Sequence, residues 1–167
     1  MRRGYPAVEG IRVAHDVFRE LLDSLETTPA AITGLGVGIP GPIDTRTGRV
    51  GSGTILPEWI GEPLRELIQS RFEIPALIEN DANLGALAEY TWGVARGVSD
   101  AVYIKIASGI GAGIIVDGRL YRGGSGTAGE IGHVTVNPAG AACRCGNRGC
   151  LETVASVPVI LERLAAS

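Results

Sequence analysis

The sequence has little positive charge, few aromatic side chains and no long uninterrupted apolar segment. Its 15 lysine and arginine residues are outnumbered by 18 acidic residues, so the net charge is −3, and the basic residues form no long block. A segment that grips a nucleic-acid backbone needs a basic patch. We therefore do not expect this chain to bind DNA or RNA by itself.

Two further absences concern export and membranes. The first residues, Met-Arg-Arg-Gly-Tyr-Pro, contain no apolar stretch of the kind that a signal peptide needs. The longest apolar stretch, from Ala101 to Val116, is interrupted by Lys105 and by several glycines. It is too short and too broken to cross a bilayer. The sequence therefore predicts a cytoplasmic location and no membrane contact.

Glycine and aliphatic residues are what the chain has in quantity. Hydrophobic residues make up 45% of its 167 residues while aromatic residues make up only 5%, which indicates an aliphatic core. The length suits one average domain or two small lobes. The 25 glycines lie between apolar runs, where the backbone turns tightly or approaches a ligand.

Stretches of helical spacing alternate with short apolar runs, which is the pattern of an α/β fold. We expect two lobes, residues 1–98 and 99–167, with the boundary in the turn at 97–100. The expected helices cover 8–25, 63–72, 80–92 and 154–164. The expected strands cover 32–39, 76–78, 101–106 and 114–116, with a glycine hairpin over 108–113.

The chain has only three cysteines, and all three lie within eight residues. An odd number does not fit a disulfide framework, and in a reducing compartment such a cluster points to a metal. His133, Cys143, Cys145 and Cys150 offer the four nitrogen and sulfur ligands that a structural zinc ion prefers. The alternatives are three reduced cysteines on a loop, or a redox pair formed by Cys143 and Cys145.

Five segments match motifs of a known family in order along the chain. They are Gly38–Pro42, Glu79–Asn83, Ser108–Ile114, Gly126–His133 and Cys143–Glu152. On these motifs the chain resembles the ROK family, named for repressors, open reading frames and kinases. The resemblance implies an actin-like, hexokinase-like (ribonuclease H-like) fold, with a hexose or amino sugar in the cleft between two α/β lobes. It also implies a homodimer or higher homo-oligomer.

The resemblance also implies roles for particular residues. Asp81 matches the general base of the family's kinases, although by itself it reads as a helix cap. Asn80, Glu130, His133 and Glu152 match residues that bind the sugar. Without the resemblance, Asn80 reads as a turn residue and Glu152 as a solvated residue at a helix start, and His133 could instead donate to the backbone.

Backbone amides of the glycine segment could hold phosphate oxygens. Ser108, Gly109 and Gly111 are the candidates, and the alternative is a tightly packed hairpin. The chain has no Asp-x-Gly-Gly-Thr segment, which clasps ATP in ROK kinases. Ile55 stands where many of those kinases carry an asparagine. We therefore expect a central fragment, incomplete at both ends.

Three functions remain open at this point. The first is the sugar-sensing domain of a repressor, which would contact DNA only through a region absent from this chain. The second is a sugar kinase that needs ATP and Mg²⁺, with Asp81 as base. The third is an assembly domain.

Overall fold

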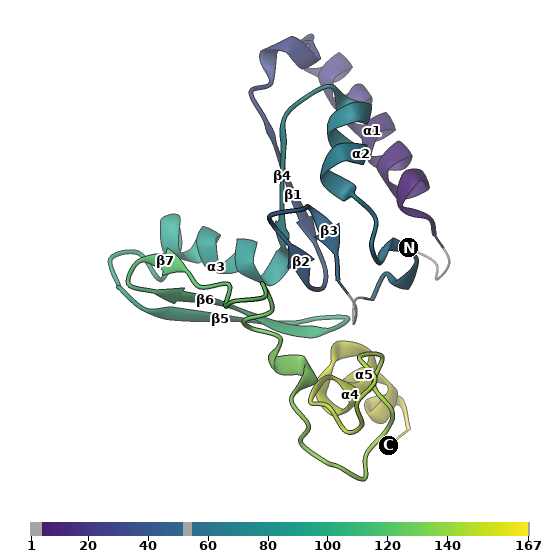
Figure 1. The fold of residues 1–167 in the computed structure, drawn as a ribbon, viewed down its shortest axis with the longest axis vertical. Helices are drawn as coiled ribbons and strands as arrows, with labels where there is room; N and C mark the ends of the chain where they lie inside the picture. Colours follow the sequence, from purple (N-terminus) through teal and green to yellow (C-terminus); the bar gives the residue numbers. More distant parts are fainter. Residues whose placement is uncertain (1–4, 52–54, 167) are drawn as a thin grey trace.

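The structure, a computed structural model, describes residues 5–51 and 55–166 in three successive parts (Figure 1). The helices are α1 (Ala7–Ser24), α2 (Leu64–Phe72), α3 (Asp81–Thr91), α4 (Glu152–Ala155) and α5 (Val157–Ala165), with single 3₁₀ turns η1 (Pro29–Ala31), η2 (Pro57–Trp59) and η3 (Ile131–His133). The strands are β1 (Leu35–Ile39), β2 (Ile43–Asp44), β3 (Arg49–Val50), β4 (Ala76–Asn80), β5 (Ala101–Ile106), β6 (Ile110–Val116) and β7 (Arg119–Leu120). The mixed α/β class expected from the sequence is thus confirmed.

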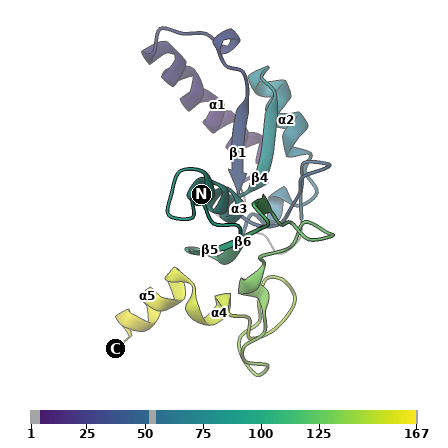
Figure 2. The same ribbon diagram turned by 90° about the vertical axis from the view of Figure 1, so that its left-hand side faces the viewer.

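The first part consists of α1 and α2 packed on short β-structure. Strands β1 and β4 run side by side in parallel, with Leu35 opposite Ala76 and Ile39 opposite Asn80 (Figure 2). Strands β2 and β3 form a small hairpin beside them. One apolar cluster holds these elements together: Ala7, Ile11, Ile39, Ile43, Val50, Trp59, Leu64, Ile68, Ala76 and Ile78.

The step from β4 to α3 positions the residues that matter most for the site. Strand β4 ends at Asn80 and α3 begins at Asp81, with no loop between them. The Asn80 side chain caps the helix, since its Oδ1 accepts from the backbone N–H of Ala82 at 2.8 Å and of Asn83 at 3.1 Å. Satisfying these free amides fixes the start of the helix.

The second part is the antiparallel sheet β5–β6–β7, with α3 lying along one face (Figure 1). The helix approaches so closely that glycine is required on both sides of the contact. A Cβ on Gly113 of β6 would lie 2.4 Å from the Ala82 carbonyl oxygen, and one on Gly85 of α3 would lie 2.4 Å from Cε1 of Tyr103. The other face of β5 leaves Val102, Ile104 and Ile106 exposed.

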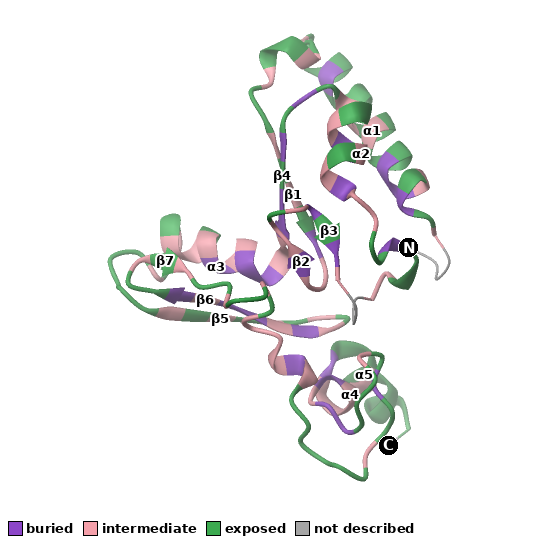
Figure 3. Ribbon diagram, in the orientation of Figure 1, coloured by how far each residue is buried: buried purple, intermediate pink, exposed green. Residues whose placement is uncertain are grey.

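The third part runs from η3 through the cysteine segment to α5. Bridges between Thr135 and Cys150 and between Ala142 and Arg148 close the segment into a knuckle. Gly149 is essential to this shape, because its φ is +60° and a Cβ there would lie 1.5 Å from the Asn137 carbonyl oxygen. Helix α5 packs loosely and has no buried residue (Figure 3).

Some element boundaries differ from those expected. Strand β1 begins at Leu35, three residues later than predicted, and Pro63 precedes α2 as its cap. The glycine hairpin is shorter than predicted, since β6 already begins at Ile110. The single C-terminal helix predicted over 154–164 is two helices, separated at Ser156, whose backbone is extended (ψ 154°). Within the described ranges, none of the helices is both long and apolar enough to span a membrane.

Candidate functional site

A pocket that is partly open to solvent lies where the three parts meet. It is bounded by the β4–α3 step, the β5–β6 turn, η3 and the start of α4. Its wall is formed by Pro40, Gly41, Ile55, Asn80, Asp81, Lys105, Ser108, Gly109, Ile110, Gly111, Glu130, His133 and Glu152. The residues predicted for sugar or phosphate contact are all among them, and so is the apolar Ile55.

Asp81 is the first residue of α3 and faces a partner that the sequence reasoning missed. The Lys105 ammonium of β5 forms an ion pair with Asp81 Oδ2. Both side chains are about three-quarters buried, with relative exposures of 25% and 28%. Alternation along β5 could have indicated this, because it puts Lys105 on the same face as Tyr103, which packs on α3.

Asn80 is committed to holding the backbone in place. Besides capping α3, its Nδ2 donates to the Gly41 carbonyl at 2.9 Å. One amide hydrogen is left over for a ligand, since the side-chain amide has two. Asn80 thus joins the Pro-Gly-Pro turn to the helix start on the pocket wall.

Glu130 and His133 lie one turn apart at η3. His133 Nε2 is 3.8 Å from Glu130 Oε2, and Nδ1 on the other side of the ring is 3.5 Å from Cys143 Sγ. Burial raises the pKa of the Glu130 carboxyl, His133 lowers it, and the negative charges of Glu152 and Asp81 raise it further. The pocket therefore gathers three carboxylates whose charges interact.

Glu152 is buried and is not the solvated residue that its position at a helix start allowed. Its Oε2 accepts the Ile110 N–H at 3.0 Å, and Oε1 pairs with Arg144 at 2.6 Å. Gly109 must be glycine for this arrangement, because a Cβ there would lie 2.5 Å from Glu152 Oε2. The knuckle and the β5–β6 turn are joined through this carboxylate.

A second buried carboxylate, Glu79, lies next to Asn80 in β4, outside the pocket wall. The sequence alone does not predict a role for it. It accepts from the Asn80 backbone and from Asn83 Nδ2, both at 2.9 Å, and pairs with Arg122 at 2.8 Å. A buried carboxylate is tolerated when its oxygens are satisfied in this way. Glu79 thereby fixes the last residues of β4.

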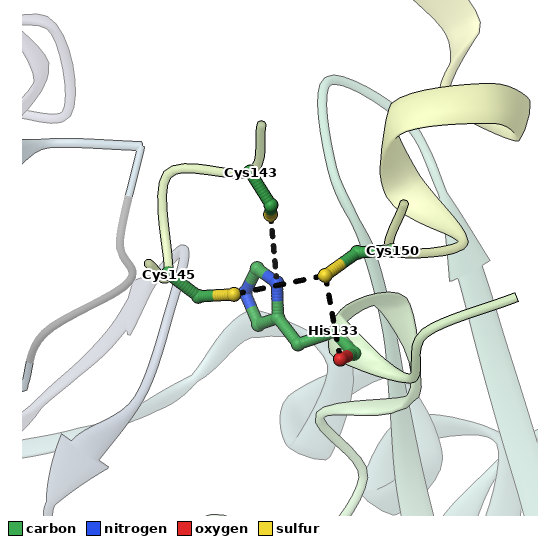
Figure 4. A group of neighbouring side chains, drawn as sticks. All are labelled: His133, Cys143, Cys145 and Cys150. Carbon is green, nitrogen blue, oxygen red and sulfur yellow. Dashed lines mark hydrogen bonds between the residues drawn. The ribbon is translucent and has the colours of Figure 1, made fainter. Parts of the chain in front are cut away.

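The four predicted metal ligands converge on one point (Figure 4). His133 comes from η3 and the three cysteines come from the knuckle, and the ligand atoms all lie within 4.8 Å of one another. All three cysteines are free. The sulfur atoms of Cys145 and Cys150 are 3.7 Å apart, far beyond the roughly 2.05 Å of a disulfide.

Two of the distances between ligand atoms match those around a tetrahedral ion. Zinc–sulfur bonds of about 2.3 Å and zinc–nitrogen bonds of about 2.0 Å place tetrahedral ligands roughly 3.8 Å apart for two sulfurs and about 3.5 Å apart for sulfur and nitrogen. The corresponding separations are 3.7 Å for Cys145–Cys150 and 3.5 Å for Cys143–His133. The four residues could therefore hold one metal ion, with all four positions taken by protein.

The chain matches known proteins along most of its length. The profile of the ROK family matches residues 9–166. The xylose repressor of Caldicellulosiruptor bescii is 40% identical over 97% of this chain, which spans 40% of the repressor. Other curated relatives include glucokinases, such as that of Halalkalibacterium halodurans, 37% identical over 84% of this chain and 43% of its own length.

A solved structure extends the likeness to the fold. The Streptomyces griseus ROK family glucokinase, in complex with glucose and AMPPNP, is 32% identical and has a TM-score of 0.75 over 92% of this chain and 50% of its own. The expected hexokinase-like architecture is thereby confirmed for the part that these residues cover. The chain spans less than half the length of these curated relatives.

Proposed function

The chain belongs to the ROK family, and on that premise we propose that it is the sugar-binding, kinase-like domain of a transcriptional regulator. The proposed ligand is a hexose or an amino sugar. One observation supports this most: Asn80, Asp81, Glu130, His133 and Glu152 line a single pocket. Carboxylates and amides of this kind accept from and donate to paired sugar hydroxyls.

The relatives' names widen the set of sugars worth testing. Several are xylose repressors, and others are glucokinases. D-Xylose has the ring of D-glucose without the hydroxymethyl group. We therefore include both sugars, with N-acetylglucosamine, as candidate ligands.

We assign zinc to the cluster of His133, Cys143, Cys145 and Cys150, in a structural role. One imidazole and three thiolates are a donor set that structural zinc favours, and a filled coordination shell leaves no place for a reactive water. The ion would brace the pocket, because Nε2, on the opposite edge of the His133 ring from Nδ1, lies 3.8 Å from Glu130 Oε2. In this proposal, the regulator contacts DNA through a region that is not part of these residues. A homodimer is also part of the proposal.

A sugar kinase is the second candidate, and the place of Asp81 favours it. The carboxylate lies in the same pocket as Ser108 and Gly109, whose backbone amides could hold phosphate oxygens. In that function Asp81 would take the proton from the attacking hydroxyl, and ATP with Mg²⁺ would be required.

Calorimetry and an ATP assay on the same preparation separate the two functions. For a sensor we expect saturable binding of at least one of the three sugars and no sugar-dependent release of ADP when ATP and Mg²⁺ are added. Glu152→Gln should weaken binding about tenfold or more, because it removes a charged acceptor. Asp16→Asn, an exposed residue on α1, serves as the matched control.

The outcomes exclude one another. ADP release that depends on sugar and is lost in Asp81→Asn would replace the sensor by the kinase. If none of the three sugars binds at millimolar concentration, the sugar-binding proposal is wrong for this chain.

A further inference from the structure

We propose that Lys105 and Asp81 act as a pair on one sugar hydroxyl: the carboxylate accepts its hydrogen bond while the ammonium donates to its oxygen. This inference rests on the proposed sugar-binding function and assigns Lys105 to the ligand. It also explains how the pocket can hold a sugar without reacting with it.

The packing of α3 on β5 fixes the two residues opposite each other. Tyr103 lies against Gly85, so these residues mark one point of contact between strand and helix. Asp81 lies four residues before Gly85 on the helix, a rise of about 6 Å. Lys105 lies two residues beyond Tyr103 on the strand, a rise of about 6.8 Å. The matching rises keep the ammonium beside the carboxylate.

The neighbourhood leaves room for a ligand beside the ion pair, in reach of both side chains. The residue opposite Lys105 on β6 is Gly111, which has no side chain to cover the ammonium. Among the described residues, the Asp81 carboxylate pairs with Lys105 through Oδ2, so Oδ1 can accept from a ligand. An ammonium carries three hydrogens, of which the ion pair uses one.

The position of the charge has a chemical consequence. A hydroxyl attacks a phosphoryl group through a lone pair on its oxygen. An ammonium that donates to that oxygen engages a lone pair and disfavours the attack. The sugar hydroxyl is then held from both sides, and Asp81 acts as a hydrogen-bond acceptor instead of a base.

The alternative is that Lys105 only offsets the charge of the pocket, in which Asp81, Glu130 and Glu152 interact. In that role, removing the Lys105 charge changes the affinity for every sugar by the same factor, because the effect depends on total charge. With a direct contact, the affinity for the sugar that lacks the contacted hydroxyl no longer depends on Lys105. This difference decides the design of the test.

The test is calorimetry of D-glucose, D-xylose and their monodeoxy derivatives with the wild-type chain, Lys105→Met and the control Arg119→Met. Methionine keeps the length of the side chain without the charge, and Arg119 is an exposed cation on β7. We expect Lys105→Met to lower the affinity for the parent sugar about tenfold or more, since hydrogen bonds to charged groups are strong. One deoxy sugar should bind the wild type more weakly than the parent sugar does, and Lys105→Met should not lower its affinity further.

A second measurement uses the fact that Lys105 is the only lysine in the sequence. Protein grown with ¹³C-lysine gives one Cε signal in an NMR spectrum, so no assignment is needed. We expect saturating sugar to shift this signal in the wild type, and the deoxy sugar identified by calorimetry to leave it nearly unshifted.

Two results would contradict this paired contact. One is that Lys105→Met binds every sugar with an affinity within twofold of the wild type. The other is that Lys105→Met lowers the affinity by the same factor for the parent sugar and for every deoxy derivative. ATP-dependent phosphorylation by the wild type would also contradict it. If the wild type binds no sugar, the proposed function falls and this inference falls with it. If the wild type binds and Lys105→Met is unaffected, only this inference falls.

Discussion

At the scale of single residues, His133 and Cys150 connect the metal-ligand cluster to the pocket. The imidazole of His133 faces Cys143 with Nδ1 and Glu130 with Nε2. Cys150 is fully buried, and its Sγ lies 3.5 Å from the His133 carbonyl oxygen. A change at either residue therefore reaches the backbone of η3, which carries part of the pocket wall.

Metal affinity should rise with pH. Burial raises the pKa of the Cys150 thiol to about 12, and hydrogen bonds and charge from Cys143 and Cys145 act in the same direction. The metal-free protein thus keeps this proton at neutral pH, and zinc must displace it when it binds the thiolate. We expect the affinity to increase about tenfold per pH unit for each proton released, measured by competition with a chelator between about pH 6 and 8.

Cys150→Ser is the matched control for this prediction. It should bind zinc more weakly and should lose one proton from the pH dependence. A zinc affinity that is independent of pH in the wild type would contradict the assignment of thiolate ligands.

At the scale of elements, the contact between α3 and β5 sets the geometry of the pocket. We expect Gly85→Ala to lower the free energy of unfolding by about 1–3 kcal/mol, because the new methyl group overpacks against the Tyr103 ring. In an open helix the same change stabilises by roughly 1 kcal/mol. Urea unfolding followed by circular dichroism measures the sign.

Tyr103→Leu provides the background that isolates the cause. With the ring gone, Gly85→Ala should become neutral or stabilising. If Gly85→Ala stabilises the protein while Tyr103 is still present, the close approach of α3 and β5 is wrong.

The sequence predicts the elements better than their packing. The periodicity of 8–25 correctly predicts α1, but Val13, Val17 and Leu21 are exposed, because only the stripe that contains Ala7, Ile11 and Leu22 is buried. Which apolar face is buried depends on the neighbouring helix, and spacing alone does not contain that information.

The same limit applies to the site. The four metal ligands and the pocket residues lie close in sequence to recognisable motifs, and they come together as expected. The glycines over 108–113 predict a hairpin, yet Gly111 and Gly113 lie in β6, where the close approach of α3 excludes a side chain at Gly113. Lys105 was missed because its partner lies on another element, 24 residues away in the chain.

At the scale of the whole molecule, the first and third parts have separate sources of stability. The first has the apolar cluster around Leu64 and Ile68. The knuckle has short bridges, glycine turns and the metal cluster, and its helix α5 buries no residue. Loss of the metal should therefore affect the third part first.

We expect removal of zinc by a chelator to weaken sugar binding while the first part remains folded. The physical reason is that Glu130, His133 and Glu152 are attached to the knuckle, whereas α1 and α2 are not. Calorimetry before and after chelation measures the affinity, and the fluorescence of Trp59, which is buried in the first part, reports its fold. Because Trp92 is exposed, a Trp92→Phe background makes that signal specific.

Readdition of zinc should restore the affinity. Sugar binding that is unchanged after the metal is fully removed would contradict the bracing role of the knuckle. Simultaneous loss of binding and of the Trp59 signal would show that the parts unfold together.

Because the His133 imidazole contacts both the metal-ligand cluster and the pocket, sugar binding should be visible in the absorption spectrum of a coloured metal. Cobalt(II) binds nitrogen and sulfur ligands as zinc does, and in a tetrahedral thiolate site it absorbs visible light with an intensity that depends on the ligand geometry. A sugar hydroxyl that engages the Nε2 side of His133 would alter the bond that Nδ1 makes to the ion. Cobalt-loaded protein should then change its visible spectrum as the pocket fills, which would make it an optical indicator of its own ligand.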